Sequence, residues 1–496
     1  MEKVLVVDIG TTNLKAGVID EKGKVFSYAE EEIKLHRPEM GAAEHNPEEL
    51  YAIFKKVCRI AAKGFEKNIS LLVLSSYQCG FLSVDSSVRP LTNIITLLDT
   101  RCEDISEEMK KKYDMQKIYN RTGCPPLFIY ALPRIFWLKK KSPEILAHTR
   151  YFLGCKDYII YRLTGEVCTE PSLASATQLF NIHTLDWDHY ALDIAGIERR
   201  KLPSVIPGER IMGVISAKAR DELGLKAGVS ILPGVYDGGT VAIGLGGFEK
   251  GAGVINLGTT AMLRVSSSKP ILDRKDMRLQ TYYLCAGKWI PGAAINNAGI
   301  VLQWLKKNIF YCGKEQGVYE KMISPAEEVA PGSDGLFFLP FLTGEREPKI
   351  GNIAKGVFFG LKEYHKRAHL VRSSLEGTAY FLRLIKEALQ KNGVKLKELR
   401  IGGGGSNSAL WVQIISDVAS LPCRRVSSGY TFLLGGAILG YTALGRYSSI
   451  EKATGAMLNL SKPLTPSKGN VKIYNEMFKR FSFLLDKMSG IYPEFI

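Results

Sequence analysis

The sequence predicts an α/β protein built from two related halves. A chain of 496 residues is too long for one hydrophobic core, so two or more domains are expected. Strand and helix patterns alternate from the start of the chain, which is typical of a layered α/β fold. The segment Val7-Asp8-Ile9-Gly10-Thr11-Thr12 recurs as Ile255-Asn256-Leu257-Gly258-Thr259-Thr260, each time between two apolar strand patterns. The recurrence indicates that the second half repeats the first.

Local signals place the first elements of the chain. Strands are predicted at residues 4–7, 14–20, 25–29 and 71–75. A helix is predicted to start with Asn46 as its cap and Pro47 at its first position, and to run to about Gly64. Near the end of the chain, residues 474–488 have a helical pattern.

The composition is that of an ordinary globular protein and limits the classes of partner. The 66 Lys and Arg exceed the 50 Asp and Glu by 16, but the lysines occur singly or in short runs, so we expect solvated helix faces and no nucleic-acid partner. No apolar run is long enough to span a bilayer, and we expect no membrane partner. The nine cysteines are odd in number and contain no C-x-x-C pair, which favours free thiols in the cytoplasm.

The two Gly-Thr-Thr segments are candidate phosphate-binding turns. Glycine permits a tight backbone turn, and threonine hydroxyls together with backbone amides suit phosphate oxygens. Either segment alone also fits an ordinary β-hairpin. Their occurrence in both halves favours the functional interpretation.

Asp237 is a candidate base. It follows the apolar run 230–235 and precedes a helix predicted from Thr240 to Leu245, so it lies at the carboxyl end of a strand and near a helix N-terminus, which favours its ionised form. An ionised, positioned Asp can accept a proton from a hydroxyl group. The alternative is that Asp237 only caps the helix.

A glycine-rich turn follows the strand pattern at residues 399–401. Gly403, Gly404 and Gly405 precede a helical pattern that contains Trp411. Glycines here let a flat ring or a phosphate approach the backbone closely, although such a tract also fits a flexible turn.

In order, these parts resemble the FGGY family of carbohydrate kinases, within the actin-like ATPase superfamily, over nearly the whole chain. The most specific match is Gly356-Val357-Phe358-Phe359-Gly360-Leu361 followed after seven residues by His369-Leu370-Val371-Arg372-Ser373-Ser374-Leu375-Glu376. Also similar are Ala43-Glu44-His45-Asn46-Pro47-Glu48-Glu49, Asp99-Thr100-Arg101 and Arg162-Leu163-Thr164-Gly165-Glu166.

The resemblance implies two ribonuclease H-like (actin-like ATPase) domains with a cleft between them. Residues 1–246 would bind the sugar and supply the base, and residues 247–496 would bind the nucleotide. ATP and Mg²⁺ would be the cofactors, and the partner would be a small carbohydrate. The sequence leaves a homodimer open.

Roles for single residues also follow from the resemblance. Asp237 would be the base, and Asp8 would help to place the metal and the γ-phosphate. Seven residues would hold the phosphates and the adenosine. Thr11, Thr12, Gly258 and Thr259 would contact the phosphates, and the turn of Gly403, Gly404 and Gly405 would lie against the adenine and ribose. The sugar pocket would be lined by Gln78, Cys79, Asp99 and Arg101.

The sequence departs from the family where the sugar binds. Tyr77-Gln78-Cys79 stands where many members have Gln-Met-His or Ala-Met-His, Arg134 replaces a lysine, and Gly238 follows the predicted base. Gluconate kinases are the most similar branch, which implies a sugar acid as the substrate. Kinases for ketopentoses (xylulose, ribulose) or keto-sugar acids are alternatives, and an actin-like ATPase without a sugar substrate is an alternative from another class.

Overall fold

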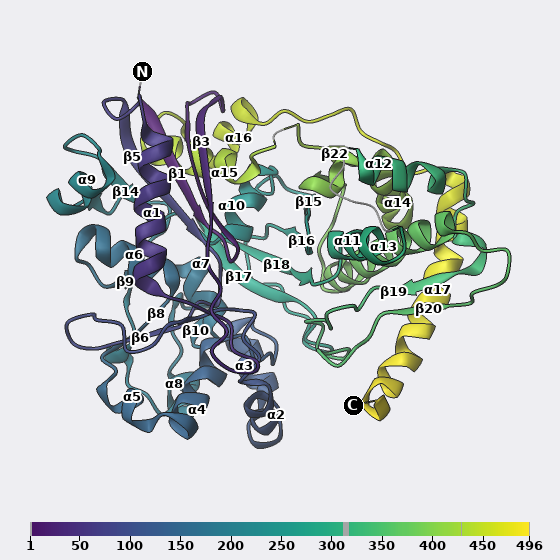
Figure 1. Cartoon of the computed structure of the whole chain (residues 1–496), viewed down its shortest axis with the longest axis horizontal. Coiled ribbons are helices and arrows are strands. Elements are labelled where there is room, and N and C mark those ends of the chain that lie inside the picture. Colours follow the sequence, from purple (N-terminus) through teal and green to yellow (C-terminus); the bar gives the residue numbers. More distant parts are fainter. Residues whose placement is uncertain (1, 311–316, 428, 496) are drawn as a thin grey trace. The chain divides into compact units, whose positions relative to one another are not determined.

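The computed structural model describes residues 2–310, 317–427 and 429–495, and these form two compact units (Figure 1). The first unit contains the described residues up to Phe248, together with Ser267–Ile290 and Tyr430–Leu458. The second contains the described residues of Glu249–Ser266, of Pro291–Gly429 and from Asn459 onward. Two segments beyond residue 247 thus belong to the first unit, and the division into domains at residues 246 and 247 stays a prediction.

A mixed six-stranded sheet forms the centre of the first unit. Its order is β13 (Gly213–Val214), β14 (Ser230–Leu232), β5 (Ile69–Ser76), β1 (Lys3–Ile9), β2 (Asn13–Ile19) and β3 (Val25–Glu32). Strand β1 is antiparallel to β2 and parallel to β5 and therefore lies in the middle of the sheet. Its side chains from Val4 to Val7 are all buried, as expected for a central strand covered on both faces.

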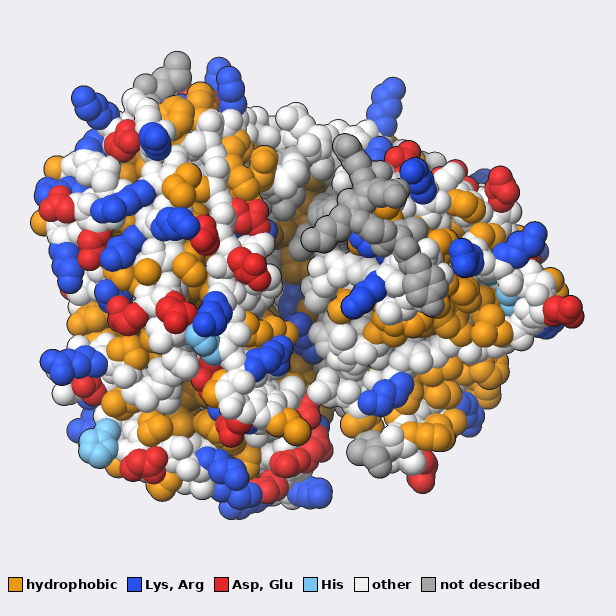
Figure 2. Space-filling view, in the orientation of Figure 1, with side chains coloured by type: hydrophobic (Ala, Val, Ile, Leu, Met, Phe, Trp, Pro, Cys, Tyr) orange, Lys and Arg blue, Asp and Glu red, His pale blue; other side chains and the backbone are white. Residues whose placement is uncertain are grey.

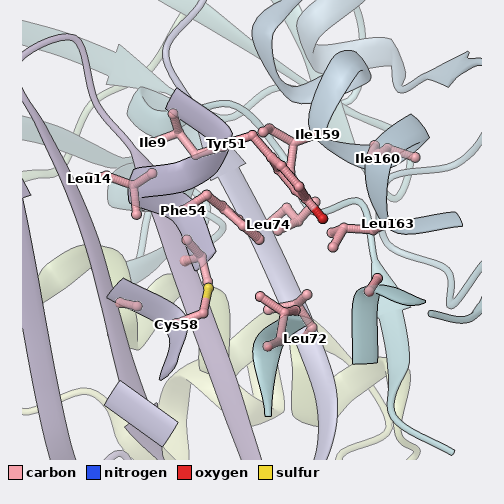
Figure 3. Close-up of a cluster of buried hydrophobic side chains, with 14 of the residues drawn as sticks. Ile9, Leu14, Tyr51, Phe54, Cys58, Leu72, Leu74, Ile159, Ile160 and Leu163 are labelled. Atoms are coloured by element: carbon pink, nitrogen blue, oxygen red, sulfur yellow. The ribbon is translucent and has the colours of Figure 1, made fainter. Parts of the chain in front are cut away.

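Helices α1 (Pro47–Ala62) and α6 (Cys155–Thr164) cover one face of this sheet (Figure 3). Tyr51, Phe54 and Cys58 of α1 pack over the sheet, and Ile159 and Leu163 of α6 lie beside them, all within one buried apolar cluster. As predicted, Asn46 caps α1, because its side chain accepts hydrogen bonds from the amides of Glu48 and Glu49.

Helices α10 (Asp237–Gly244) and α15 (Thr431–Ala443) also pack in the first unit, and α15 lies against β1 and β5. Glycines allow the close approach: a Cβ on Gly436 would lie 2.3 Å from Val6, and one on Gly435 would lie 1.9 Å from the carbonyl of Thr240. This packing explains why residues 430–458 belong to the first unit.

The rest of the first unit consists of shorter elements. The helices are α2 (Glu103–Lys112), α3 (Met115–Thr122), α4 (Ala131–Lys141), α5 (Pro143–His148), α7 (Pro171–Ala174), α8 (His189–Ala195), α9 (Ala217–Leu223) and α16 (Ile450–Met457). The 3₁₀ turns are η1 (Ser175–Thr177) and η2 (Arg199–Lys201). The short strands are β4 (Glu44–His45), β6 (Leu82–Val84), β7 (Ile94–Ile95), β8 (Tyr151–Leu153), β9 (Cys168–Thr169), β10 (Phe180–Asn181), β11 (Asp186–Trp187), β12 (Ser204–Val205) and β17 (Gln280–Cys285).

The second unit repeats the central sheet of the first. Its strands lie in the order β18 (Lys288–Ile295), β16 (Ala261–Val265), β15 (Ala252–Leu257), β21 (Glu398–Gly402) and β22 (Cys423–Arg425). Strand β15 is antiparallel to β16 and parallel to β21, as β1 is to β2 and β5. The repeat predicted from the sequence therefore corresponds to two strands with the same place in their sheets.

The other elements of the second unit are mostly helices. They are α11 (Gly299–Asn308), α12 (Val318–Ile323), α13 (Arg367–Lys391), α14 (Ala409–Ala419) and α17 (Lys468–Ile491). The 3₁₀ turns are η3 (Ser324–Glu327), η4 (Ser333–Gly335), η5 (Gly404–Asn407) and η6 (Tyr492–Phe495), and β19 (Phe337–Leu339) pairs with β20 (Val357–Phe359).

Two predicted helix starts are wrong. The helix near the predicted base begins at Asp237 instead of Thr240, because Gly238 and Gly239 fit within its first turn. The last helix begins at Lys468 instead of residue 474, since its polar first turns hide the start from an apolar pattern.

Basic and acidic side chains are interspersed on the face shown in Figure 2, with no single large patch of either sign. Within the described ranges, no helix has the length and apolar character needed to cross a bilayer. No disulfide joins any of the eight described cysteines to another, and the ninth, Cys312, lies outside the described residues.

Candidate active site

Asp8 lies near the carboxyl end of β1, beside the strand end of β5. In register it pairs with Lys15 on β2 and Ser75 on β5, and the hydroxyl of Ser75 donates a 2.8 Å hydrogen bond to its Oδ1. Burial raises the pKa of the Asp8 carboxyl, and the Ser75 hydrogen bond opposes that rise. The charges of Lys15 and Lys156 also favour the carboxylate.

The first Gly-Thr-Thr turn follows Asp8 directly and rests on a buried histidine. The amide of Gly10 donates to the carbonyl of Asn13 at 3.0 Å, which closes the turn, and Thr12 is exposed. His45 Nε2 donates to the carbonyl of Thr11 at 3.1 Å, and its Nδ1 accepts from the Tyr77 hydroxyl at 3.0 Å. Desolvation lowers the pKa of His45 to about 4, so the ring is neutral.

Asp237 is the first residue of α10, and Tyr236 occupies the N-cap position. Asp237 is half-buried, and its Oδ1 accepts a 2.7 Å hydrogen bond from the amide of Gly238. A carboxylate at this place is favoured by the positive end of the helix dipole. The structure therefore places a partly exposed carboxylate at the start of α10, after β14, and its role as a base stays a prediction.

The turn at Gln78 and Cys79 follows β5 and has an unusual backbone. Cys79 has a left-handed conformation with φ of 60°, and its thiol approaches the carbonyl of Ala176 at 3.6 Å. Arg134 is buried and donates to the carbonyls of Cys79, Ile95 and Thr96. This arginine fixes the Cys79 turn against the segment that leads to Asp99.

Asp99 and Arg101 form an ion-pair network. Asp99 is buried and accepts from the amide of Ala43 and from the guanidinium of Arg101. Arg101 also pairs with Glu39 and Glu44 and stacks on Trp137, with the guanidinium 4.6 Å from the ring centroid. These contacts show a structural role for both residues, and their role in binding a sugar stays a prediction.

Aromatic hydroxyls that the sequence did not single out also lie in the first unit. The hydroxyls of Tyr130 and Tyr282 are 2.9 Å apart, and the ring of Tyr282 lies edge-on to Tyr236 with the centroids 6.0 Å apart. No pattern in the sequence brings Tyr130 and Tyr282 together, because 152 residues separate them.

In the second unit, the Gly258-Thr259 turn lies on the start of α11. The carbonyl of Gly258 accepts from the amide of Gly299, and that of Thr259 accepts from the amides of Ala298 and Ile300. A Cβ on Gly299 would lie 2.6 Å from the Gly258 carbonyl, so this contact requires glycine. The turn and the helix start thus support each other through backbone groups alone.

A pocket of about 1020 Å³ opens beside this turn within the second unit. Its floor includes the buried side chains of Leu302, Ile323 and Trp411, which suit a flat ring. Polar lining comes from side chains that the sequence did not single out: Gln303, Tyr319, Glu320, Ser324, Glu327, Asn407 and Ser408.

The predicted glycine turn divides into two parts at this pocket. Gly404 and Gly405 line it, and a Cβ on Gly404 would meet nothing within 4 Å. Gly403 instead packs against β15: its φ is 86°, and a Cβ would lie 2.8 Å from Asn256 Oδ1 and from the Leu257 carbonyl. Gly403 shapes the turn and Gly404 faces open space, while Gly405 lines the pocket and also packs closely, because a Cβ there would lie 2.6 Å from Leu257.

Comparison with known proteins decides the class. The model of the N-terminal domain of the FGGY family of carbohydrate kinases matches residues 3–244, and that of the C-terminal domain matches residues 253–444. The chain belongs to this family. It is therefore a sugar phosphotransferase with an alcohol acceptor, and the α/β fold predicted for such kinases is confirmed.

Individual relatives of this family extend over the full chain. A gluconokinase from Bacillus subtilis is 32% identical over 500 residues, covering 99% of this chain and 97% of that protein. A xylulose kinase from Lactococcus lactis is 27% identical, covering 97% of this chain and 95% of that protein. The crystal structure of gluconate kinase from Lactobacillus acidophilus superposes with a TM-score of 0.95 at 25% identity and covers all of both chains.

Proposed function

We propose that this carbohydrate kinase transfers the γ-phosphate of ATP to a hydroxyl group of a small sugar acid, with gluconate as the first substrate to test. The observation that supports the proposal is a difference in charge between two equivalent strand ends. Strand β1 has the carboxylate Asp8, and β15 has the neutral Asn256 at the same place. One carboxylate would suffice to hold a metal beside the phosphates, and a second carboxylate would repel the phosphates.

The second unit binds the nucleotide in this proposal. Its pocket accepts the adenosine, with Gly404 and Gly405 against the ring or ribose, and Gly258 and Thr259 hold the phosphates. Gly403 acts indirectly by keeping the turn in shape. A volume of about 1020 Å³ exceeds the space that a nucleoside needs, and it falls at the upper end of the range for ligand pockets.

The donors at Asp8 fit Mg²⁺. Mg²⁺ prefers oxygen ligands and is usually held by one or two carboxylates together with phosphates and waters. Among the described residues, no three acidic, histidine or cysteine side chains gather as a metal cluster, so Asp8 would hold the ion with the substrate phosphates. Bound there, Mg²⁺ would neutralise charge on the transferring phosphoryl group, and Thr11 and Thr12 would orient it.

Asp237 would accept the proton of the attacking hydroxyl, and the first unit would hold the sugar near Gln78 and Cys79. Phosphoryl transfer requires little covalent help, so the rate depends on alignment of the hydroxyl and on neutralisation of charge. Asp99 and Arg101 would also belong to the substrate pocket in this proposal. They would act by holding the loop around Glu39, Ala43 and Glu44, which they contact.

A change at the base tests the mechanism. Asp237→Asn should lower kcat by about 10³-fold or more because the hydroxyl loses its proton acceptor, while ATP still raises the thermal midpoint. The matched control is Asp486→Asn on the exposed surface of α17, which should leave kcat unchanged. Full activity of Asp237→Asn would end the base assignment.

A substrate panel tests the specificity. Gluconate should release ADP in a coupled assay with a higher kcat/KM than xylulose, ribulose, keto-sugar acids or glycerol. The second candidate is a ketopentose kinase, which the similarity to xylulose kinases favours. Activity on a ketopentose alone would move the substrate to that branch and leave the mechanism in place.

We further propose that the enzyme works in the cytoplasm, because no disulfide joins the eight described cysteines to one another. A homodimer is the assembly to test, by size-exclusion chromatography with light scattering. A monomer in solution would remove the homodimer from the proposal.

A further inference from the structure

A fully buried ion pair lies in the first unit. Lys156 Nζ, on α6, is 2.9 Å from Glu170 Oε1, and both side chains have no exposed surface. Removing two charges from water is unfavourable unless each finds further hydrogen-bond partners. The partners of Glu170 therefore show what this pair holds in place.

Glu170 accepts hydrogen bonds from the first turn of α7. The amides of Ser172 and Leu173 donate to its carboxylate at 2.6 and 3.1 Å, and the hydroxyl of Ser172 donates at 2.8 Å. The charge of Glu170 thus fixes both the backbone and the side chain of Ser172.

Ser172 also contacts Tyr236, the residue before the proposed base. Its Oγ accepts a 2.9 Å hydrogen bond from the amide of Tyr236. An amide can only donate, and the single hydroxyl proton of Ser172 is used on Glu170, so the direction of both bonds is determined. The result is a continuous path from Lys156 through Glu170 and Ser172 to the amide of Tyr236, the residue before Asp237.

Other contacts also hold this segment, including a 2.8 Å hydrogen bond from the amide of Thr240 to the carbonyl of Tyr236. Gly234 has φ of 64° and packs so closely that a Cβ would lie 1.9 Å from the carbonyl of Leu74, and its amide donates to the Gly208 carbonyl. Tyr236 forms a parallel bridge with Ser76 at the end of β5. Ser172 adds a side-chain contact on the amide of Tyr236.

The same segment, residues 170–176, also contacts the turn predicted to bind the sugar. The carbonyl of Ser172 lies 3.5 Å from Gln78 Nε2, and the carbonyl of Ala176 accepts from the Cys79 thiol. One buried pair is therefore connected to the segment of the base and to the sugar turn.

We infer that Lys156, Glu170 and Ser172 are positioning residues for phosphoryl transfer, which hold Asp237 in line with the acceptor hydroxyl. The inference rests on the proposed role of Asp237. A displacement of a reacting group by about 1 Å can lower a rate by about 10²-fold, so loss of this path acts on kcat more than on nucleotide binding.

Ser172→Ala is the first test. It removes the hydroxyl that joins Glu170 to the Tyr236 amide and should lower kcat by about 10- to 100-fold, with the KM for ATP within about twofold of the wild type. Ser416→Ala is the matched control, because it removes an equally buried hydroxyl in the second unit, which donates to the Leu421 carbonyl. The control should change kcat by less than about twofold.

A double-mutant cycle separates positioning from general loss of structure. In the Asp237→Asn background, Ser172→Ala should cause less than about a twofold further loss, because the group it positions is already gone. A full 10- to 100-fold further loss would show that Ser172 acts independently of Asp237 and would overturn the inference.

Glu170→Gln provides a second variant that keeps the shape and removes the charge. Glu376→Gln is its control: Glu376 is buried in the second unit and accepts from Arg372, Tyr474, Ser333 and the Gly332 amide. Both variants should lower the thermal midpoint, and only Glu170→Gln should lower kcat at temperatures where the protein is folded. Equal kcat in the two variants would refute the positioning role.

The outcomes also distinguish this inference from the proposed function. If Asp237→Asn is inactive while Ser172→Ala and Glu170→Gln keep the wild-type kcat, only the positioning role is wrong. If Asp237→Asn keeps full activity, the proposed base is wrong, and the positioning role is overturned with it.

Discussion

The two central sheets share a strand order and differ in what their strand ends carry. In the first unit, the ends of β1 and β5 carry Asp8, a turn braced by His45, and the Gln78-Cys79 turn. In the second, the ends of β15 and β21 carry Asn256, a turn braced by the start of α11, and three glycines. The two copies thus differ in charge at the strand end, and in the proposed mechanism the first copy supplies the charged group and the second holds the nucleotide mainly through its backbone.

The largest expected effect comes from the one carboxylate that distinguishes the copies. Asp8→Asn should lower kcat by about 10³-fold or more, because the metal and the transferring phosphoryl group lose a charged partner. Asn256→Ala should lower it by less than about tenfold, since the nucleotide turn is held through its backbone. Steady-state kinetics with saturating Mg²⁺ measures both. Equal losses at the two positions would contradict the division of roles.

The pH dependence of stability tests a difference between the two Gly-Thr-Thr turns. The first is contacted by the titratable side chain of His45, and the second is contacted by backbone amides at the start of α11. His45 has its pKa lowered to about 4 in the folded protein and near 6.5 when unfolded, so the unfolded chain binds the proton first as the pH falls. The contribution of His45 to the free energy of unfolding is complete above pH 6.5. The free energy of unfolding should fall by up to about 3 kcal/mol as the pH drops toward 4.

Urea unfolding from pH 7 to pH 4 measures this loss. His45→Gln keeps a donor for the Thr11 carbonyl and should show a smaller loss than the wild type over that range. His148→Gln, at an exposed position on α5, is the control and should follow the wild type. A parallel decline of all three proteins would mean that His45 does not control the pH dependence.

Two neighbouring glycines of the second unit, Gly403 and Gly404, differ in how much space surrounds them. Gly403→Ala should lower the free energy of unfolding by about 2 kcal/mol or more, because φ is 86° and the new Cβ would meet Asn256 and the Leu257 carbonyl at 2.8 Å. Gly404→Ala meets no atom within 4 Å and should change stability by less than about 0.5 kcal/mol. Denaturant unfolding measures both. Similar stabilities would show that the turn can shift to accept a side chain.

The smallest expected effect on stability comes from the N-terminal ends of helices α1 and α11, which are capped in different ways. Asn46 caps α1 with its side chain, whereas turn carbonyls accept the first amides of α11. Asn46→Ala should therefore cost about 1 kcal/mol of unfolding free energy, and Asn46→Asp only a few tenths, because the acceptor remains. Thermal unfolding of the pair provides the measurement. A loss as large in Asn46→Asp as in Asn46→Ala would argue against the capping contribution.

Much of the fold follows from local sequence signals. The repeated Gly-Thr-Thr segments correspond to equivalent strands, and the cap at Asn46 and the strands around Asp8 follow the predicted pattern. The start of α10 was misplaced because Gly238 and Gly239 resemble a turn when only local propensity is considered. Family membership followed from ordered motifs, which the two family models confirm.

The sequence by itself determined the class of fold, the family and the residue types available for phosphate chemistry, because these depend on short segments and their order. Only the tertiary structure decided that Ser172 accepts from the amide of Tyr236, that His45 donates to the Thr11 carbonyl and that residues 430–458 pack in the first unit. Each of these depends on contacts between segments that are far apart along the chain. Such contacts arise from packing and from the need of buried polar groups for partners, and no local pattern encodes them.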